Sequence, residues 1–213
     1  MLGLLGGTFD PIHVGHLDVA DVARRVMGLD HILLVPSNIP PHRSAPLASA
    51  PHRFAMAVLA AEDRADLRVS DLEMVSTEPS YTSATLDRLS ESGIDTRTVS
   101  LVIGADAFRE IRTWKGFPQI LDRCHFVVVS RRGIPAPSLR EALPEWSGRM
   151  IDVARMSRFD AGIEPQIILI DAPTASVSST DVRRRVAASE SIAGLVPDRV
   201  ARYISTYGLY ERA

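Results

Sequence analysis

Short runs of consecutive apolar residues recur along the chain, separated by longer segments in which apolar positions return every three or four residues. Runs of this length are typical of strands buried on both faces, and the longer segments have the period of amphipathic helices. The apolar runs predict strands at residues 2–5, 31–35, 67–70, 98–103, 125–130 and 166–170. The longer segments predict helices at residues 15–27, 51–62, 82–92, 179–188 and 197–207.

The order of these elements predicts an α/β fold. Strands alternate with helices, which favours a doubly wound, mostly parallel sheet covered on both faces. Ligands of such sheets bind beyond the carboxyl ends of the strands, near a topological switch point. In the last helix, Val200, Ile204 and Leu209 are expected to pack inward. We therefore expect a single domain over residues 1–213, with C-terminal helices at about 179–210 closing the ligand site.

Two proline-rich stretches interrupt the alternation. Residues 36–51 contain five prolines and show no hydrophobic period. A structureless loop of that length inside a compact domain is usually functional or disordered. Residues 131–149 contain three prolines, and we expect them to form an excursion on the surface.

The composition narrows the class of protein. With 46% hydrophobic and 23% charged residues, the chain has the balance of a globular protein with a sizeable core. Its formal net charge of −2 provides no general attraction to nucleic acid or to anionic membranes, so neither is an expected partner. Cys124 is the only cysteine, which excludes an intramolecular disulfide, and we expect it to be buried. The sequence shows no basic leader and no apolar run of about 18 residues, and it predicts a cytoplasmic protein.

The most distinctive segment follows the first predicted strand and reads Gly-Gly-Thr-Phe-Asp-Pro-Ile-His-Val-Gly-His, from Gly6 to His16. A strand, a glycine turn and a helix N-terminus bring backbone N–H groups together where the helix dipole is positive, which favours anion binding. The glycines alone fit a plain tight turn equally well. His13 and His16 share one side of the helix start, where they can bind phosphate, support packing or hold a metal. A metal is the weakest interpretation, because no second His or Cys cluster provides more ligands.

This segment resembles the signature of the nucleotidylyltransferase superfamily, whose core motif is His-x-Gly-His. Members transfer a nucleoside monophosphate from a nucleoside triphosphate to an acceptor phosphate and release pyrophosphate. The resemblance implies a Rossmann-like fold with a small helical C-terminal part.

Further motifs are similar to those of one branch, the bacterial nicotinate-nucleotide adenylyltransferases. They are Pro-Ser-Asn-Ile-Pro-Pro-His-Arg at 36–43, Pro-Ser-Tyr-Thr at 79–82, Gly-Ala-Asp at 104–106 with Trp114 downstream, and Ser-Ser-Thr-Asp-Val-Arg at 178–183. Residues 133–163 contribute nothing to the resemblance. Two positions depart from it: Arg43 stands where lysine is more common, and Arg132 replaces a proline. The first change keeps the charge but not the geometry of a point charge.

The resemblance implies adenylyl transfer from ATP to nicotinate mononucleotide in NAD biosynthesis. Mg²⁺ is expected to bridge the ATP phosphates, held by water and phosphate oxygens, with no protein metal site. The implied catalytic residues are His13, His16 and Arg183. The implied ATP-binding residues are Gly6, Gly7, Thr8, Phe9, Gly15, His16, Gly104, Asp106, Ser178, Ser179, Thr180 and Arg183. The implied acceptor-binding residues are Arg43, Tyr81, Thr82, Asp106, Trp114 and Arg131.

Several of these assignments have a structural alternative. Ser178 and Asp181 also form the pattern of a capping box, and Asp106 also fits the N-cap of a helix that starts one residue later. The pair at 81–82 fits a helix cap as well. Trp114 also fits a core position, although its polar and charged neighbours favour contact with an aromatic ligand.

Four questions stay open. Nothing in the sequence separates the acid from the amide form of the mononucleotide acceptor. Another phosphate acceptor, such as phosphopantetheine, is disfavoured by Trp114 and by the Pro-Pro-His-Arg loop. A nucleotide-binding regulator without catalysis is disfavoured by the intact motifs. The sequence also leaves open whether the chain forms a homo-oligomer.

Overall fold

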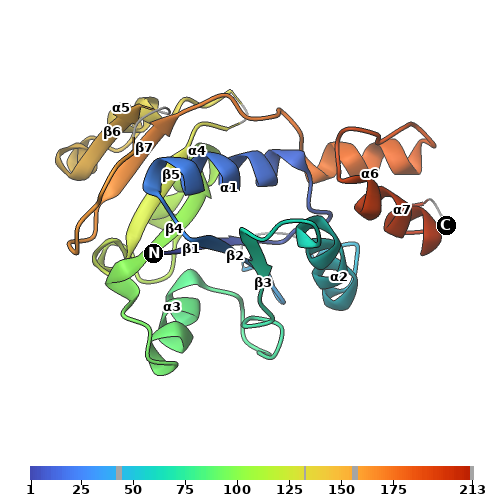
Figure 1. The fold of residues 1–213 in the computed structure, drawn as a ribbon, viewed down its shortest axis with the longest axis horizontal. Coiled ribbons are helices and arrows are strands. Elements are labelled where there is room, and N and C mark those ends of the chain that lie inside the picture. Colours follow the sequence, from blue (N-terminus) through green and yellow to red (C-terminus); the bar gives the residue numbers. More distant parts are fainter. Residues whose placement is uncertain (42–44, 132, 155–157, 212–213) are drawn as a thin grey trace.

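The computed structural model describes residues 1–41, 45–131, 133–154 and 158–211. Within them, one parallel sheet has the strand order β3-β2-β1-β4-β5-β7-β6 (Figure 1). The strands are β1 (Leu2–Gly7), β2 (His31–Pro36), β3 (Leu67–Val69), β4 (Val99–Gly104), β5 (His125–Val129), β6 (Met150–Ala154) and β7 (Ile167–Asp171). The predicted α/β fold with a parallel sheet is therefore confirmed.

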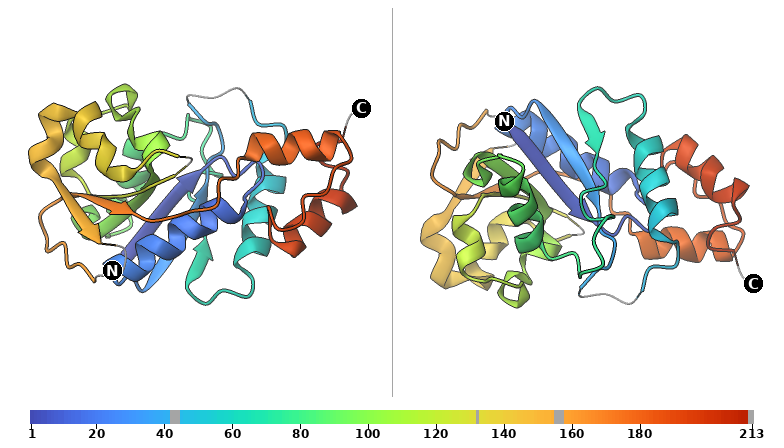
Figure 2. Two further views of the ribbon diagram at one scale, coloured as in Figure 1. Left: turned by 90° about the horizontal axis from the view of Figure 1, so that it is seen from above. Right: turned by 90° about the horizontal axis from the view of Figure 1, so that it is seen from below.

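The helices cover both faces of this sheet, as Figures 1 and 2 show. They are α1 (Val14–Met27), α2 (Ala50–Ala61), α3 (Thr82–Glu91), α4 (Ala105–Phe108), α5 (Leu139–Ala142), α6 (Ser179–Ala187) and α7 (Asp198–Thr206). Short 3₁₀ helices are η1 (Thr96–Thr98), η2 (Ile111–Thr113), η3 (Gln119–Asp122), η4 (Ala136–Ser138) and η5 (Pro144–Arg149). All the predicted helices are present. In the described part of the chain, no helix is both long and apolar enough to cross a membrane.

The core consists of two layers, one on each face of the sheet, because successive side chains along a strand point to opposite faces. Val127 and Val129 of β5 pack with α1 and α2 on one face. Phe126 and Val128 of the same strand pack with α3, α4 and α5 on the other. Because both faces of the central strands are covered, their sequences are almost continuously apolar, and this is the signal from which they were predicted.

Strand β6 is the one strand that the sequence analysis missed. It pairs only with β7 and forms an edge of the sheet. Met150 and Val153 are buried, while Asp152 and Ala154 are exposed. A half-buried edge strand of five residues has too short an apolar run to stand out in the sequence.

The expectation that residues 131–149 form a surface excursion was wrong for much of the segment. It contains η4, α5 and η5, and the side chains of Ala136, Leu139 and Leu143 are buried in the second core layer. Prolines at helix starts, where no N–H is needed, explain why a proline-rich stretch still folds into helical turns.

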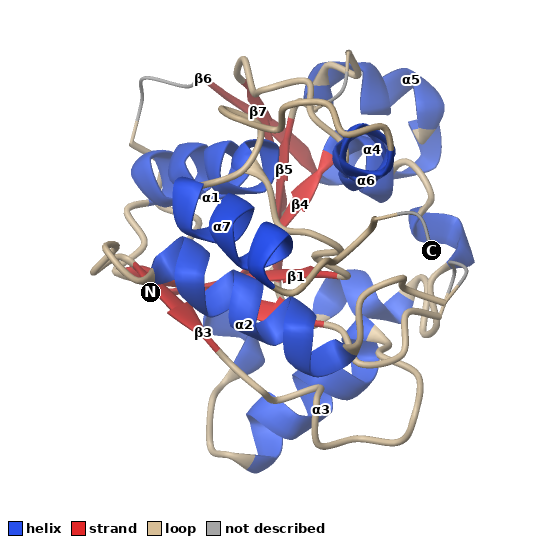
Figure 3. Cartoon of the chain, turned by 90° about the vertical axis from the view of Figure 1, so that its right-hand side faces the viewer, coloured by secondary structure: helices blue, strands red, loops and turns tan. Residues whose placement is uncertain are grey.

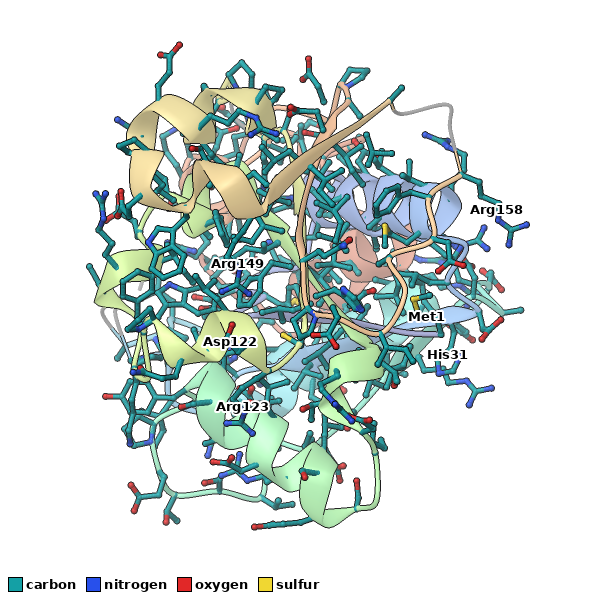
Figure 4. All side chains as sticks on the ribbon, turned by 90° about the vertical axis from the view of Figure 1, so that its left-hand side faces the viewer. Met1, His31, Asp122, Arg123, Arg149 and Arg158 are labelled. Atoms are coloured by element: carbon teal, nitrogen blue, oxygen red, sulfur yellow. The ribbon has the colours of Figure 1, made fainter. Side chains whose placement is uncertain are left out.

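Helices α6 and α7 lie beyond the carboxyl end of β1, where Figure 3 shows them toward the viewer. Val200 and Ile204 of α7 are buried, as predicted. Leu209 also packs against this layer, although it lies just beyond the end of the helix. Met1 and His31, which are labelled in Figure 4, lie at the amino ends of β1 and β2, away from these two helices.

Candidate active site

The sheet reverses its winding between β1 and β4. Strand β1 continues through α1 to β2 on one side, whereas β4 continues to β5 on the other. The carboxyl ends of β1, β4 and β5 therefore surround a topological switch point, which is where open α/β sheets bind ligands. The glycine–histidine segment follows β1, Gly104 ends β4, and Arg131 follows β5 by two residues.

His13 and His16 face each other at the start of α1. Their rings stack with centroids 3.7 Å apart and planes inclined by 25°. The backbone N–H of His13 donates to Nδ1 of His16 at 3.3 Å. His13 is buried, and Nη2 of Arg131 lies 3.4 Å from its Nε2. The prediction that the two histidines share one side of the turn is confirmed, and an arginine joins them.

In the glycine turn before the histidines, the space beside Gly6 is open, whereas the space beside Gly7 is filled by a side chain. A Cβ at Gly6 would meet no atom within 4 Å, whereas one at Gly7 would lie 2.8 Å from the Phe9 ring. The ring of Phe9 is buried and packs edge-on against His16. Any ATP contact at Phe9 would therefore use its backbone, which has a φ of 50°. ATP binding by residues 6–9 stays a prediction.

Gly15 has a packing reason to be glycine. A Cβ there would lie 2.8 Å from the Ala175 carbonyl oxygen and 3.2 Å from the His13 ring. The sequence placed Gly15 among the expected ATP-binding residues, but in the structure protein atoms already occupy the space beside its Cα. A ligand contact at Gly15 stays a prediction that would have to use the backbone.

Asp106 and Arg131 meet over the end of β4. A Cβ at Gly104 would lie 2.5 Å from Oδ1 of Asp106 and 2.7 Å from Cδ of Arg131. The N-cap of α4 is Gly104, and Asp106 lies inside the first turn. The alternative assignment of Asp106 as an N-cap was therefore wrong, because the helix begins earlier than expected. The carboxylate lies at the predicted ligand edge.

The start of α6 is held against the segment between β1 and α1. The Ser179 hydroxyl donates to the Pro11 carbonyl at 2.9 Å, and Nη1 of Arg183 donates to the Asp10 carbonyl at 2.6 Å. Ser178 caps the helix by accepting from the Asp181 N–H, whereas the Asp181 carboxylate accepts from Arg184 and Arg185, so one half of the predicted capping box is present. A helix N-terminus and an arginine thus come close to the histidines.

Tyr81 and Thr82, two of the residues predicted for the acceptor, lie next to the segment that follows Trp114. Tyr81 is the N-cap of α3 and Thr82 its first residue. Nζ of Lys115 lies 4.7 Å above the Tyr81 ring, which brings the loop after Trp114 next to this helix start. Trp114 is partly buried and packs on the second core layer, so both its core and its ligand interpretations remain.

Arg43, an expected acceptor contact, lies outside the described residues, as does Arg132. Arg131 exchanges backbone hydrogen bonds with Ile134, at 3.1 and 3.0 Å, so a short turn fixes the residue that reaches His13.

Comparison with known proteins agrees with this geometry. Residues 4–185 match the cytidylyltransferase-like family. A probable nicotinate-nucleotide adenylyltransferase of Roseiflexus sp. (strain RS-1) is 38% identical, with 98% of this chain and 97% of the relative covered. A protein of the same description from Desulfatibacillum aliphaticivorans is 39% identical over 98% of this chain and 99% of the relative. The chain belongs to the nicotinate-nucleotide adenylyltransferase family.

A solved structure extends the likeness to the fold. The nicotinic acid mononucleotide adenylyltransferase of Plasmodium falciparum, solved in complex with NaAD, superimposes with a TM-score of 0.75. The comparison covers 98% of this chain and 96% of that one at 20% sequence identity. At this identity the match supports the fold of this family member, not the roles of its residues.

Sequence reasoning gave no role to Arg53, although this arginine occupies an apolar position in the helical pattern of α2. Arg53 is fully buried on the same face of α2 as Met56, Ala57 and Ala60. Its guanidinium donates to the carbonyls of Thr8, Ala48, Ser37 and Asn38 at 2.5 to 3.2 Å. Burial lowers the pKa of this guanidinium, which nearby Asp10 opposes. An arginine at an otherwise apolar helical spacing was the pattern that could have revealed this support for the loops after β1 and β2.

Glu73 was missed as well, in the loop before α3. The Thr85 hydroxyl donates to its carboxylate at 2.5 Å. Burial raises the pKa of Glu73, while hydrogen bonds from Thr85 and Ser80 act in the opposite direction. A buried carboxylate thus fixes the start of α3, next to Tyr81.

Proposed function

We propose that this protein transfers the adenylyl group of ATP to nicotinate mononucleotide, giving nicotinate adenine dinucleotide and pyrophosphate. The observation that carries the proposal is the convergence of His13, His16, Arg131 and the start of α6 at one edge of the sheet. The descriptions of full-length relatives at 38–39% identity support the same reaction.

The chemistry is an in-line displacement at the α-phosphorus. An oxygen of the acceptor phosphate forms the new P–O bond while the bond to the bridging oxygen of the β-phosphate breaks, and pyrophosphate leaves with that electron pair. The enzyme then has no covalent intermediate to form, so catalysis consists of positioning and stabilisation of negative charge. Donors fixed before the substrate arrives lower the barrier most, because they need not reorient during the reaction.

We assign the donors by their position around the histidine pair. His13 and His16 would donate to the oxygens of the transferred phosphate, since their stacked rings present ring nitrogens at the helix N-terminus. Arg183 and the hydroxyls of Ser179 and Thr180 would hold the leaving pyrophosphate. The contact of Arg183 with the Asp10 carbonyl keeps its guanidinium near residues 10–13 for this role.

The acceptor would bind toward β4, β5 and α3. Asp106 would accept hydrogen bonds from ribose hydroxyls, and Arg131, fixed by its turn, would contact the acceptor phosphate. Trp114 with Tyr81 and Thr82 would enclose the pyridine ring, and stacking on an indole contributes about 0.5–1.5 kcal/mol beyond area burial. Arg43 completes the proposed set from the loop after β2.

Mg²⁺ would enter with ATP rather than occupy a protein cage. Among the described residues, no group of three or more His, Cys, Asp and Glu side chains is placed to hold a metal ion. The arginines and histidines suit phosphate oxygens instead, so phosphate and water oxygens would coordinate the ion. When bound, Mg²⁺ supplies further neutralisation of triphosphate charge. We also propose a cytoplasmic location, since a single cysteine without a disulfide partner fits a reducing compartment.

The decisive experiment measures pyrophosphate release with Mg²⁺, ATP and one acceptor at a time. Nicotinate mononucleotide should give rapid release together with a dinucleotide product that chromatography identifies. Nicotinamide mononucleotide and phosphopantetheine should each react at least ten times more slowly. Preference for either of these would overturn the acceptor assignment, and no release with any acceptor would favour a regulator that only binds nucleotide.

A further inference from the structure

The carboxylate of Asp10 joins three parts of the chain at the back of the proposed phosphate site. Asp10 is 4% exposed, and its oxygens accept hydrogen bonds from the N–H groups of Leu47 and Ala48 at 2.9 and 3.1 Å. The Tyr210 hydroxyl donates to Oδ1 at 2.8 Å. Asp10 thus connects the loop before α2 and the segment after α7 to the segment between β1 and α1.

Neighbouring residues fix the backbone around Tyr210. It has a φ of 67°, and its neighbour Leu209 donates a backbone hydrogen bond to Ile204 at the end of α7. Burial and the adjacent Asp10 raise the pKa of the Tyr210 phenol, so the hydroxyl stays protonated and donates at neutral pH. Left-handed backbone at a tyrosine is uncommon and is kept only where its surroundings fix it.

The same residue 10 also anchors Arg183. Its carbonyl accepts from Nη1 at 2.6 Å, and its Oδ2 lies 3.7 Å from that nitrogen. Any shift of residue 10 would therefore move the guanidinium assigned to the pyrophosphate. The Ser179 hydroxyl is bonded to the next residue, Pro11, so the start of α6 would move with it.

We propose that Tyr210 and Asp10 are positioning residues for the reaction: the hydrogen bond from Tyr210 fixes residue 10, and residue 10 in turn places Arg183 at the phosphates of ATP. This inference rests on the proposed function of the site, and it assigns no contact between Tyr210 and substrate. The effect of losing the hydroxyl should therefore pass through Arg183 and fall on ATP, not on the acceptor.

Tyr210→Phe tests the inference without emptying the buried space, with Tyr207→Phe as its matched control. Tyr207 belongs to the same segment but is 58% exposed. Asp10→Asn is a poorer test, because an amide cannot accept both of the loop N–H groups and the hydroxyl, and the loop itself would be disturbed. Loss of a hydrogen bond to a charged group predicts that Tyr210→Phe raises KM for ATP roughly tenfold. The KM of the acceptor should change less than twofold, and Tyr207→Phe should match the wild type.

A double-mutant cycle separates positioning from general stability. In an Arg183→Ala background, Tyr210→Phe should have little further effect on KM for ATP, because the group through which it acts is gone. Equal increases of both KM values, additive effects in the cycle, or a Tyr210→Phe enzyme equal to Tyr207→Phe would each overturn the inference. If the wild type makes no dinucleotide, the proposed function fails separately. Calorimetric binding of a non-hydrolysable ATP analogue to the same variants then decides the inference.

Discussion

Replacement of Gly15 by alanine sets two effects of known size against each other. Alanine is favoured over glycine in a helix by about 1 kcal/mol. The added methyl group, however, would lie 2.8 Å from the Ala175 carbonyl oxygen. That carbonyl cannot easily retreat, because it accepts from the Val177 N–H at 2.9 Å, and the Ala175 N–H donates to Asp18 at 2.7 Å.

We expect the steric effect to exceed the gain in helix propensity. Forcing a methyl group into packed surroundings costs about 1–3 kcal/mol, and contact with a hydrogen-bonded backbone carbonyl places this case at about 2–3 kcal/mol. After the gain of about 1 kcal/mol in helix propensity is subtracted, Gly15→Ala should lower the free energy of unfolding by about 1–2 kcal/mol. For a chain of this size, that corresponds to a decrease in Tm of about 2–8 °C. The methyl group would also press on the His13 ring, 3.2 Å away. A small displacement of that ring should lower kcat by about tenfold or more.

Thermal unfolding and steady-state kinetics measure both effects, and Gly148→Ala is the matched control. Gly148 is exposed in η5, and a Cβ there would meet no atom within 4 Å. Its replacement should leave Tm and kcat near the wild-type values. A Gly15→Ala protein as stable and as active as this control would refute the argument, because it would show that the contacts with Ala175 and His13 relax at no cost.

Three further predictions concern single side chains. His16→Ala should lower kcat by about 10²–10³-fold if its ring donates to the transferred phosphate. The control His31→Ala, at the amino end of β2, should leave kcat unchanged. Steady-state kinetics measures both effects, and loss of the circular dichroism signal of the folded protein in His16→Ala would show a merely structural role. Trp114→Ala should raise the KM of the acceptor more than the KM of ATP, and equal increases would favour the core interpretation. Burial raises the pKa of the Cys124 thiol to about 12, so a thiol reagent at pH 8 should label it only after unfolding, and rapid labelling of the native protein would contradict this burial.

The same thiol gives a pH dependence of stability. Its pKa lies near 9 when exposed and about 12 in the folded protein, so above pH 9 the unfolded chain holds fewer protons than the folded one. Stability should therefore be complete below pH 9 and decrease above it. The decrease should be smaller in Cys124→Ala, which urea unfolding at pH 8 and pH 10 would show.

The central strands and long helices could be predicted because each leaves a strong local pattern. The strands β4 and β5 are apolar except for Ser100 and His125, and α1 repeats its apolar positions at helical spacing. The edge strand β6 left no such pattern, since only part of it is buried. The turns at 131–149 were hidden by prolines, which were interpreted as breaking structure although several begin helical turns.

For the candidate site, motifs placed His13, His16, Asp106 and Arg131 at one edge of the sheet, and the structure brings them together. The supporting contacts were beyond sequence reasoning, because they join residues far apart in the chain. No spacing rule relates Tyr210 to Asp10, or a buried arginine in α2 to carbonyls of two other loops. Such contacts exist only once the fold has formed.

The separation of these contacts along the chain has a consequence for biosynthesis. The segment from Gly6 to His16 is synthesised before the residues that fix it by hydrogen bonds, which lie 168, 173 and 200 positions later in the chain. The Val14 N–H likewise waits for the carbonyl of Leu195. At about 5–20 residues per second, the histidine pair would remain without these supports for roughly ten seconds or more. A nascent chain that lacks residues 179–210 should therefore be inactive.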